Sequence, residues 1–270
     1  MRHIEPSTLL DIYPPEWHSS LDLARTTVFQ YRNLHHLKSH LKTVTQKNDT
    51  SGDISYTAAL KELLTNTPTM LEGDYQLIKN RVKSNLIKKG LISENCYENY
   101  TYDVQGEIWD VAKVIAEDPA CFLVPSQKYT SFFYELYINI SYSHTITNRE
   151  VLESMAKILA TVELLEAQHI YCKITLILPI RNCSSGTKSN FFALVPLFSH
   201  RDPKSIATMS AVLNDRLLRK FFFAILEDTY GSTLRSSYGT VVTLPMSISP
   251  HNLDEITLCS DILSRVITPL

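Results

Sequence analysis

The sequence lacks the motifs that identify common classes of enzymes, metal-binding proteins and membrane proteins. No stretch approaches membrane-spanning length, the N-terminus has no apolar signal region, and the five cysteines are scattered without zinc-ligand spacing. There is also no Walker loop, no Gly-x-Gly-x-x-Gly, no Gly-x-Ser-x-Gly elbow and no His-Glu-x-x-His. We therefore expect a protein that is not an enzyme, has no membrane association, lies in the cytoplasm and keeps its cysteines reduced.

The sequence also has no large excess of positive or negative charge. The chain has 26 Lys and Arg against 28 Asp and Glu, a formal net charge of -2. A dedicated non-specific DNA-binding protein usually has a basic excess, so the overall field does not favour nucleic acid. What is present is a globular composition, 44% hydrophobic and 20% charged, which predicts a packed core.

The first part of the chain has helical spacing. Apolar residues recur at threes and fours from Trp17 to about Thr45, and two further helical stretches follow at 56–64 and 73–89. The last of these ends on Gly90, which is typical of a helix C-cap. The pattern predicts that residues 1–95 form an N-terminal helical extension.

Residues 96–270 alternate between strands and helices. A capping box, Thr147 with Glu150, opens a long helix between two strands, and a short loop then joins the second strand to a third as an antiparallel hairpin. This order predicts an α/β domain with a mixed sheet covered by helices on both faces, a three-layer αβα arrangement. The expected strands are 134–140, 170–178, 191–198 and 239–244, and the expected later helices are 205–213, 217–227 and 252–267.

The first of these strands runs into Asn139-Ile140-Ser141-Tyr142-Ser143, which resembles the metal-binding loop of von Willebrand factor A (vWA) domains. The resemblance implies a vWA-like fold and a site for Mg²⁺ or Mn²⁺ held by Asn139, Ser141 and Ser143. Asn139 replaces the usual Asp, and Asp202 is the candidate for the second acid that the resemblance requires. The alternative is that the three residues cap loop and helix amides.

A second resemblance covers roughly residues 100–227. Tyr102-Asp103-Val104, Trp109-Asp110-Val111 and Asp118-Pro119 with Cys121-Phe122 are similar to segments of an uncharacterised family from bacteriophages and actinobacterial mobile elements. This resemblance implies a phage-encoded protein in the host cell cytoplasm. The family carries no agreed activity, so no catalytic residue follows from it.

Two functions remain open. The first is an interaction module that binds a protein partner through the loop at the C-terminal edge of the sheet, where Tyr142 and His144 lie. The alternative is an accessory factor of phage transcription or replication that binds single-stranded DNA, because basic residues beside tyrosines are typical of such surfaces. The basic residues of this alternative are Lys79, Arg81, Lys83, Lys88 and Lys89.

Two other motifs are interpreted as structural. His36 and His40 are four residues apart on an expected helix, but no third ligand is close in sequence, so a solvated helix face is favoured over a metal site. The Ser184-Ser185-Gly186 segment lacks the leading Gly of a phosphate loop and is expected to be a turn.

Overall fold

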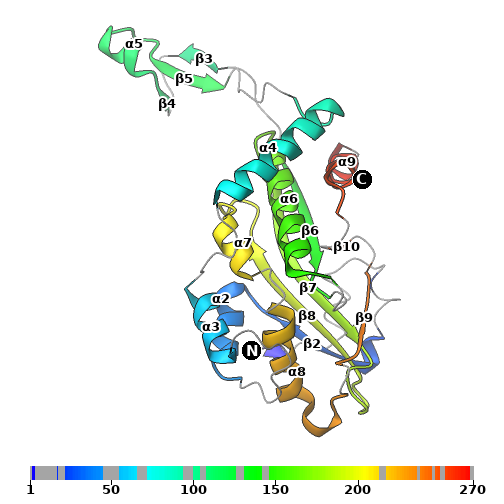
Figure 1. Ribbon diagram of the computed structural model, residues 1–270. Helices are drawn as coiled ribbons and strands as arrows, with labels where there is room; N and C mark the ends of the chain where they lie inside the picture. Colours follow the sequence, from blue (N-terminus) through cyan, green and yellow to red (C-terminus); the bar gives the residue numbers. More distant parts are fainter. Residues whose placement is uncertain are drawn as a thin grey trace.

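β7 (Ile170–Arg181) lies in the middle of a mixed sheet in the computed structural model (Figure 1). It pairs in parallel with β6 (Phe132–Asn139) and antiparallel with β8 (Asn190–Phe198). The strand order is β1-β2-β8-β7-β6-β10, and β9 pairs with the end of β7. The structure describes residues 2–3, 17, 22–44, 55–65, 72–93, 100–103, 108–125, 131–141, 146–212, 217–235, 238–244, 247–249 and 253–267.

The other elements are shorter or lie outside the sheet. The remaining strands of the sheet are β1 (Arg2–His3), β2 (Thr26–Gln30), β9 (Thr240–Val241) and β10 (Ser247–Ile248). The helices of the body are α2 (Leu34–Leu41), α3 (Tyr56–Leu64), α4 (Glu72–Lys88), α6 (Asn148–Glu166), α7 (Ile206–Val212), α8 (Phe223–Tyr230) and α9 (Glu255–Ile267). Single turns are η2 (Leu23–Arg25), the π-helical η3 (Leu217–Phe222) and η4 (Gly231–Thr233).

The predicted crossover is confirmed. α6 joins the parallel strands β6 and β7, and β8 then returns antiparallel to β7. The capping box at the start of α6 is also present: the Thr147 hydroxyl accepts from the Glu150 amide, and the Glu150 carboxylate accepts from the Thr147 amide at 2.7 Å. Local signals therefore specified this unit correctly.

The prediction for residues 1–95 differs from the structure. Thr26–Gln30 form β2, which pairs in parallel with the outer side of β8, so β8 is not an edge strand. The buried side chains of α2, α3 and α4 belong to the same core cluster as those of α6. The described residues between 2 and 93 thus contribute to the main sheet and core, and they do not form a separate helical extension.

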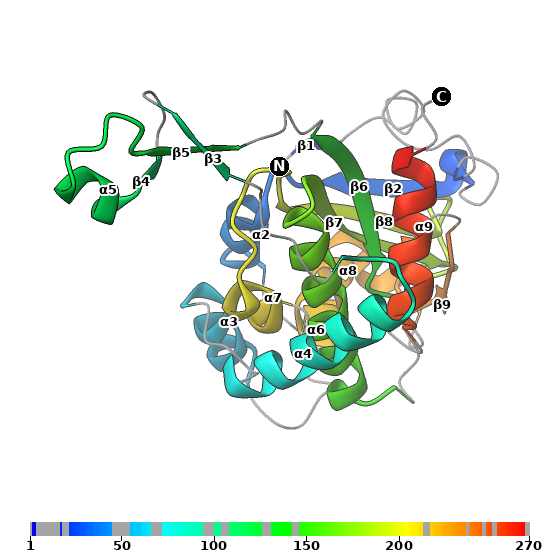
Figure 2. The same cartoon turned by 90° about the horizontal axis from the view of Figure 1, so that it is seen from above.

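The expected third layer is not formed by the described helices. The helices from α2 to α9, apart from α5, share one core cluster with alternate sheet residues such as Leu136, Ile174 and Ala193, which point to a single face. Figure 2 shows these helices gathered on one side of the sheet. On the other face a smaller cluster contains Trp17, Tyr137 and Phe192 with Val242 and Leu244. Trp17 packs edge-on against Tyr137 at 4.8 Å between ring centroids.

A small separate sheet projects from this body (Figures 1 and 2). It consists of β3 (Tyr100–Asp103), β4 (Ile108–Trp109) and β5 (Phe122–Pro125), in the order β3-β5-β4, with the short helix α5 (Val111–Ile115) at its far end. We call residues 100–125 the arm.

No helix in the described part of the chain combines the length and the apolar character needed to cross a membrane.

The core position of α6 gives a direct test of the packing. Leu159 is fully buried, whereas Leu77 on α4 is 71% exposed. We expect Leu159→Ala to lower the free energy of unfolding by roughly 2–5 kcal/mol, because it removes buried methyl groups and leaves a cavity. Leu77→Ala makes the same chemical change at the surface and should alter it by less than about 0.5 kcal/mol. Urea denaturation measures both, and equal effects would contradict the described packing.

Candidate functional site

Asn139 stands where the sequence predicted a metal ligand, at the C-terminal end of β6. It pairs with Ile177 of β7, is 1% exposed, and is followed by Ser141, which is 3% exposed. The predicted location at the strand end is therefore confirmed. Both side chains, however, are buried inside the protein.

The polar atoms of Asn139 are used within the protein. Its amide nitrogen donates to the carbonyl oxygen of Val242 at 2.7 Å. Its side-chain oxygen accepts from the amide nitrogen of Ser141 at 2.9 Å and from the Ser141 hydroxyl at 2.6 Å. An asparagine can donate and accept at once, whereas a carboxylate can only accept. This dual role gives a physical reason for Asn where vWA domains have Asp.

Asp202 cannot complete a metal site with Asn139. It follows β8, whose last residue, Phe198, pairs with Ile174 of β7. The ring of the neighbouring His200 packs against the ring of Phe133 at the start of β6, with 5.2 Å between the two ring centroids. Asp202 is thus at the opposite end of the sheet from Asn139. Its carboxylate accepts from the Ser199 amide at 2.7 Å, which lowers the pKa of that carboxyl.

The described residues therefore do not fit a divalent cation at this edge. Asn139 and Ser141 already bond to each other and to Val242, and the described part of the chain contains no group of three or more His, Cys, Asp or Glu that could hold a metal ion. Ser143, and the predicted partner-binding residues Tyr142 and His144, lie outside the described residues. The capping interpretation of Asn139 and Ser141 agrees with their hydrogen bonds.

A groove lies beside this edge, between α4 and the first turns of α6. Its volume is about 560 Å³. Leu77, Ile78 and Leu152 form its apolar part, and Leu77 is 71% exposed. We call it the α4–α6 groove; its lining residues are Asp74, Leu77, Ile78, Arg81, Asn148, Arg149, Leu152 and Glu153.

Sequence reasoning missed this groove. The signal was the isolated Leu77 on a helix whose outward positions are otherwise polar, but a single exposed leucine is common and points to nothing alone. Leu152 is only partly buried on α6, and the sequence pattern does not single it out. The groove exists because α4 crosses α6. The sequence pattern of each helix shows which of its faces is apolar, but it does not predict where the two helices cross.

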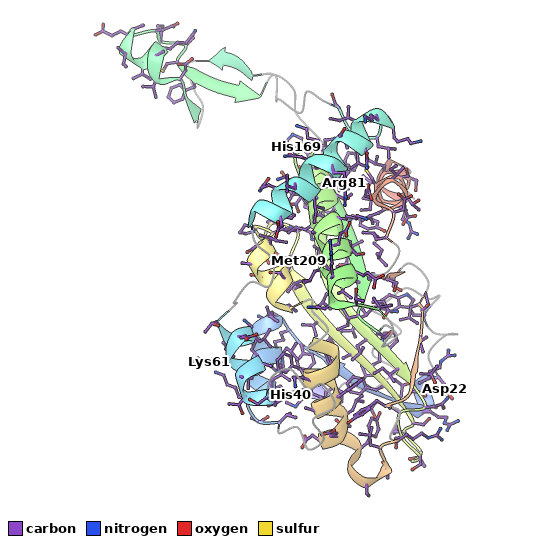
Figure 3. The ribbon with its side chains drawn as sticks, in the orientation of Figure 1. Asp22, His40, Lys61, Arg81, His169 and Met209 are labelled. Atoms are coloured by element: carbon purple, nitrogen blue, oxygen red, sulfur yellow. The ribbon has the colours of Figure 1, made fainter. Side chains whose placement is uncertain are left out.

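Ion pairs hold α4 in place across α6. Lys79 donates to the Glu163 carboxylate at 2.6 Å, and Arg81 donates to the Glu153 carboxylate at 2.8 Å. Figure 3 labels Arg81 on α4. Asn85 also donates to Glu255 of α9 at 2.9 Å. Two of the five predicted nucleic-acid-binding cations are therefore engaged within the protein. The other three, Lys83, Lys88 and Lys89, are exposed and form no salt bridge within the described part of the chain.

The thiols in the core are poorly suited to nucleophilic chemistry. Burial raises the pKa of the Cys172 thiol to about 12 and that of Cys259 to about 11. Cys183 is also fully buried, and burial raises its pKa. A thiol with a raised pKa is protonated near neutral pH and is a weak nucleophile.

The two motifs interpreted as structural are engaged in local hydrogen bonds. The Tyr31 hydroxyl and the His40 Nδ1 lie 2.8 Å apart, and His36 Nδ1 accepts from the Arg32 amide at 3.3 Å. In the predicted turn, the Ser184 hydroxyl accepts from the Gly186 amide at 3.0 Å.

The arm presents a different surface. Val111 is 66% exposed, Val114 38% and Ile115 79%, all on α5. They are three and four residues apart and so share one face of the helix. Asp110 caps α5 by accepting from the amides of Ala112 and Lys113.

The sequence matches the family described as "Domain of unknown function (DUF7192)" over residues 14–262. The chain belongs to this family. The matched range includes both the arm and the two helices that form the α4–α6 groove. No curated protein and no solved structure gave a significant match. Function must therefore be argued from the DUF7192 chain itself.

Asn139→Asp separates the metal interpretation from the capping interpretation. A buried carboxylate cannot donate to Val242, so we expect a loss of about 3 kcal/mol or more in unfolding free energy at neutral pH. Burial beside a carbonyl raises the pKa of the new carboxyl above its unfolded value. The loss should therefore be complete above that raised pKa and shrink as the pH falls towards the unfolded value, since the protonated acid can donate.

Thermal melts of the wild type and Asn139→Asp across pH, with and without Mg²⁺, measure this. A wild-type melting temperature raised by Mg²⁺, with the increase lost in Ser141→Ala, would contradict the capping interpretation.

Proposed function

We propose that this DUF7192 protein is a non-enzymatic interaction module that binds a segment of a partner protein in the α4–α6 groove. The observation that carries the proposal is the exposed Leu77 beside Ile78 and Leu152 in a concave site. Exposed apolar surface with a polar rim is typical of protein-binding sites.

The scaffold in this proposal is vWA-like in its central part. β6, α6, β7 and β8 follow the order that the resemblance predicts, and β10 adds a parallel strand on the other side of β6. The surroundings differ, because β2 covers the outer side of β8 and the described helices of the body lie on one face. We therefore limit the vWA-like interpretation to the β6–β8 unit with β10.

The location of the groove fits ligand binding in open α/β sheets. α6 begins shortly after the C-terminal end of β6, so its first turns lie near the sheet edge where such folds bind ligands. The proposal thus keeps the predicted edge but moves the contact from Tyr142 and His144 to the helices beside them.

The charges at the groove define the partner segment. The Arg149 side chain is exposed and forms no salt bridge within the described part of the chain. The hydrogen bond from Arg81 lowers the pKa of the Glu153 carboxyl, and the charge of Arg149 helps to lower it. The charged residues of the lining are balanced, with Arg81 and Arg149 against Asp74 and Glu153. A short amphipathic helix with aliphatic residues on one face and charges of both signs at its rim would complement the apolar floor and this lining.

Support for a non-enzymatic role comes from the groups that line the groove. The lining contains no His, Cys or Ser; its carboxylates are Asp74 and Glu153, and Glu153 forms a salt bridge with Arg81 at 2.8 Å. Arginine stays protonated at any physiological pH, so this pair offers no proton for acid–base chemistry.

Leu77→Asp tests the groove. Because Leu77 is 71% exposed, the substitution should leave the unfolding free energy nearly unchanged. It places a charge on the apolar floor and should weaken partner binding by roughly tenfold or more. Affinity purification from the native cell, followed by titration of the identified partner, provides the measurement.

Leu64→Asp is the matched control, since Leu64 is 37% exposed on α3 and does not line the groove. The control should bind like the wild type. A partner that binds Leu77→Asp and the wild type equally would rule out the groove.

The alternative function is binding of single-stranded DNA, as an accessory factor of phage transcription or replication. It now depends on Lys83, Lys88 and Lys89, the three cations of the predicted set without salt bridges in the described part. This function predicts binding that weakens steeply with salt and is lost when the three lysines are changed to Ala. Fluorescence anisotropy with labelled single-stranded DNA tests it, and no binding at low salt would exclude it. The phage origin stays a prediction.

A further inference from the structure

The turn between β8 and α7, residues 199–204, lies at the end of the sheet opposite to Asn139, and we call it the β8–α7 turn. The ring of His200 in this turn packs edge-on against the ring of Phe133 at the start of β6. Phe133 in turn stacks on Tyr171, its partner on β7, with 5.9 Å between the ring centroids. Aromatic contacts that begin at His200 therefore connect the turn to both central parallel strands.

A buried lysine fixes the shape of the same turn. The side chain of Lys204 is 1% exposed, and its ammonium group forms a salt bridge with the Glu166 carboxylate at the end of α6 at 2.6 Å. The ammonium group also donates to the carbonyl oxygens of Ser199 and His200, each at 3.0 Å. Because one of these acceptors belongs to the backbone of His200, a displacement of His200 also breaks a hydrogen bond of the buried lysine.

The ring of His200 has a buried nitrogen, Nε2, that finds no hydrogen-bond partner in the described part of the chain. A neutral imidazole can carry its lone pair on this nitrogen and so leaves no N–H group unpaired there. A protonated imidazole carries an N–H group on both nitrogens and a full positive charge. Protonation in the closed turn would therefore leave a charged donor buried without an acceptor, which costs free energy.

The charged groups around His200 do not remove this cost. Burial is the main cause that lowers the pKa of His200 below its usual value. The carboxylate of Glu135 on β6 acts in the opposite direction, but it already accepts from Lys173 of β7 at 2.7 Å. The charges of Lys173 and Lys204 lower the pKa of His200 further. In the turn itself, the carboxylate of Asp202 accepts from a backbone amide.

We propose that His200 is an acid-sensitive latch: when its ring is protonated, the β8–α7 turn opens and Phe133 loses the ring that packs against it. In the open turn both N–H groups of the protonated ring are hydrogen-bonded to water, whereas the closed turn leaves the group on Nε2 unpaired. The step adds one proton from solvent to the ring and breaks no covalent bond. His200 does not line the α4–α6 groove, so the latch is independent of the proposed function.

The pH range follows from the direction of the pKa shift. A histidine whose pKa is lowered in the closed state stabilises that state fully above the usual pKa of about 6.5, and this stabilisation is lost as the pH falls towards the lowered value. At about pH 5, a ring with the usual pKa is protonated in about 30 molecules for each neutral one, so the opening equilibrium rises by at most about thirtyfold. We expect a rise of several-fold between neutral pH and about pH 5.

Hydrogen–deuterium exchange of the full chain at neutral pH and at about pH 5 measures the opening of the turn. Each rate is divided by the intrinsic rate of the unstructured peptide, because the exchange chemistry itself depends on pH. The wild type should lose protection in residues 199–204 by several-fold at the lower pH. His200→Phe keeps an aromatic ring against Phe133 but cannot be protonated, so its turn should have the same protection at both pH values.

His35→Phe is the matched control, because His35 is exposed and lies on α2 in another part of the chain. This control should respond to pH as the wild type does. An equal loss of protection in the wild type and in His200→Phe would overturn the latch, since the loss would then come from another group.

A titration of the wild type tests the latch even if His200→Phe does not fold. Nuclear magnetic resonance measures the pKa of the His200 ring, which should lie below the usual value of about 6.5. A pKa at or above that value would overturn the proposal, because the closed turn would then not disfavour the protonated ring. A lowered pKa with no change in the exchange of residues 199–204 would overturn it as well, because protonation would then leave the turn closed.

Discussion

The length of β7 is the constraint on which the rest of the sheet depends. β6 ends at Asn139, opposite Ile177, while β7 continues to Arg181. Buried backbone groups need hydrogen-bond partners, so the side of β7 that β6 leaves open must be paired by another segment. β9 takes that place through Ile180 with Val241 and Arg181 with Thr240.

Asn139 joins these two segments. Its amide nitrogen reaches the Val242 carbonyl directly after β9, and its oxygen holds Ser141. Gly239 just before β9 has φ +95, and a Cβ there would lie 2.5 Å from the Arg181 carbonyl oxygen, so the close approach needs glycine. Asn139 and Ser141, the described residues of the segment that resembles a metal loop, are thus the polar part of a strand junction.

The described helices from α2 to α9, apart from α5, gather on one face of the sheet, and this has a consequence for the surface. α4 lies across α6 as an outer helix, held by Lys79 with Glu163 and Arg81 with Glu153. These pairs are partly exposed, so they set the position of α4 more than they stabilise it. The crossing leaves the first turns of α6 open beside Leu77, which creates the α4–α6 groove.

The proposed function depends on this outer layer and not on the sheet loop. The groove combines exposed apolar surface at Leu77 with two arginines and two carboxylates in its lining.

Local patterns determined the central unit from the sequence. Three features of this unit involve residues that are close in the chain, and each was predicted correctly. They are the capping box of Thr147 and Glu150, the apolar face of α6 and the short hairpin between β7 and β8. α3 at Tyr56–Leu64 and α9 ending at Ile267 were also predicted within a few residues. Helix spacing failed at Thr26–Gln30, where pairing with β8 favoured a strand for a β-branched run.

The sequence by itself thus determined a mixed α/β core, the crossover of α6 and the position of Asn139 at a strand end. Tertiary structure alone decided the chemistry there, because Val242 lies 103 residues further along the chain. It also decided that the described helices of the body, α2 to α9 apart from α5, share one core cluster, that Lys79 and Arg81 pair with α6, and that Leu77 lies in a groove. These features depend on contacts between segments that are distant in the sequence. A periodic pattern predicts which face of a helix or strand is apolar, but it does not predict which other element packs against that face.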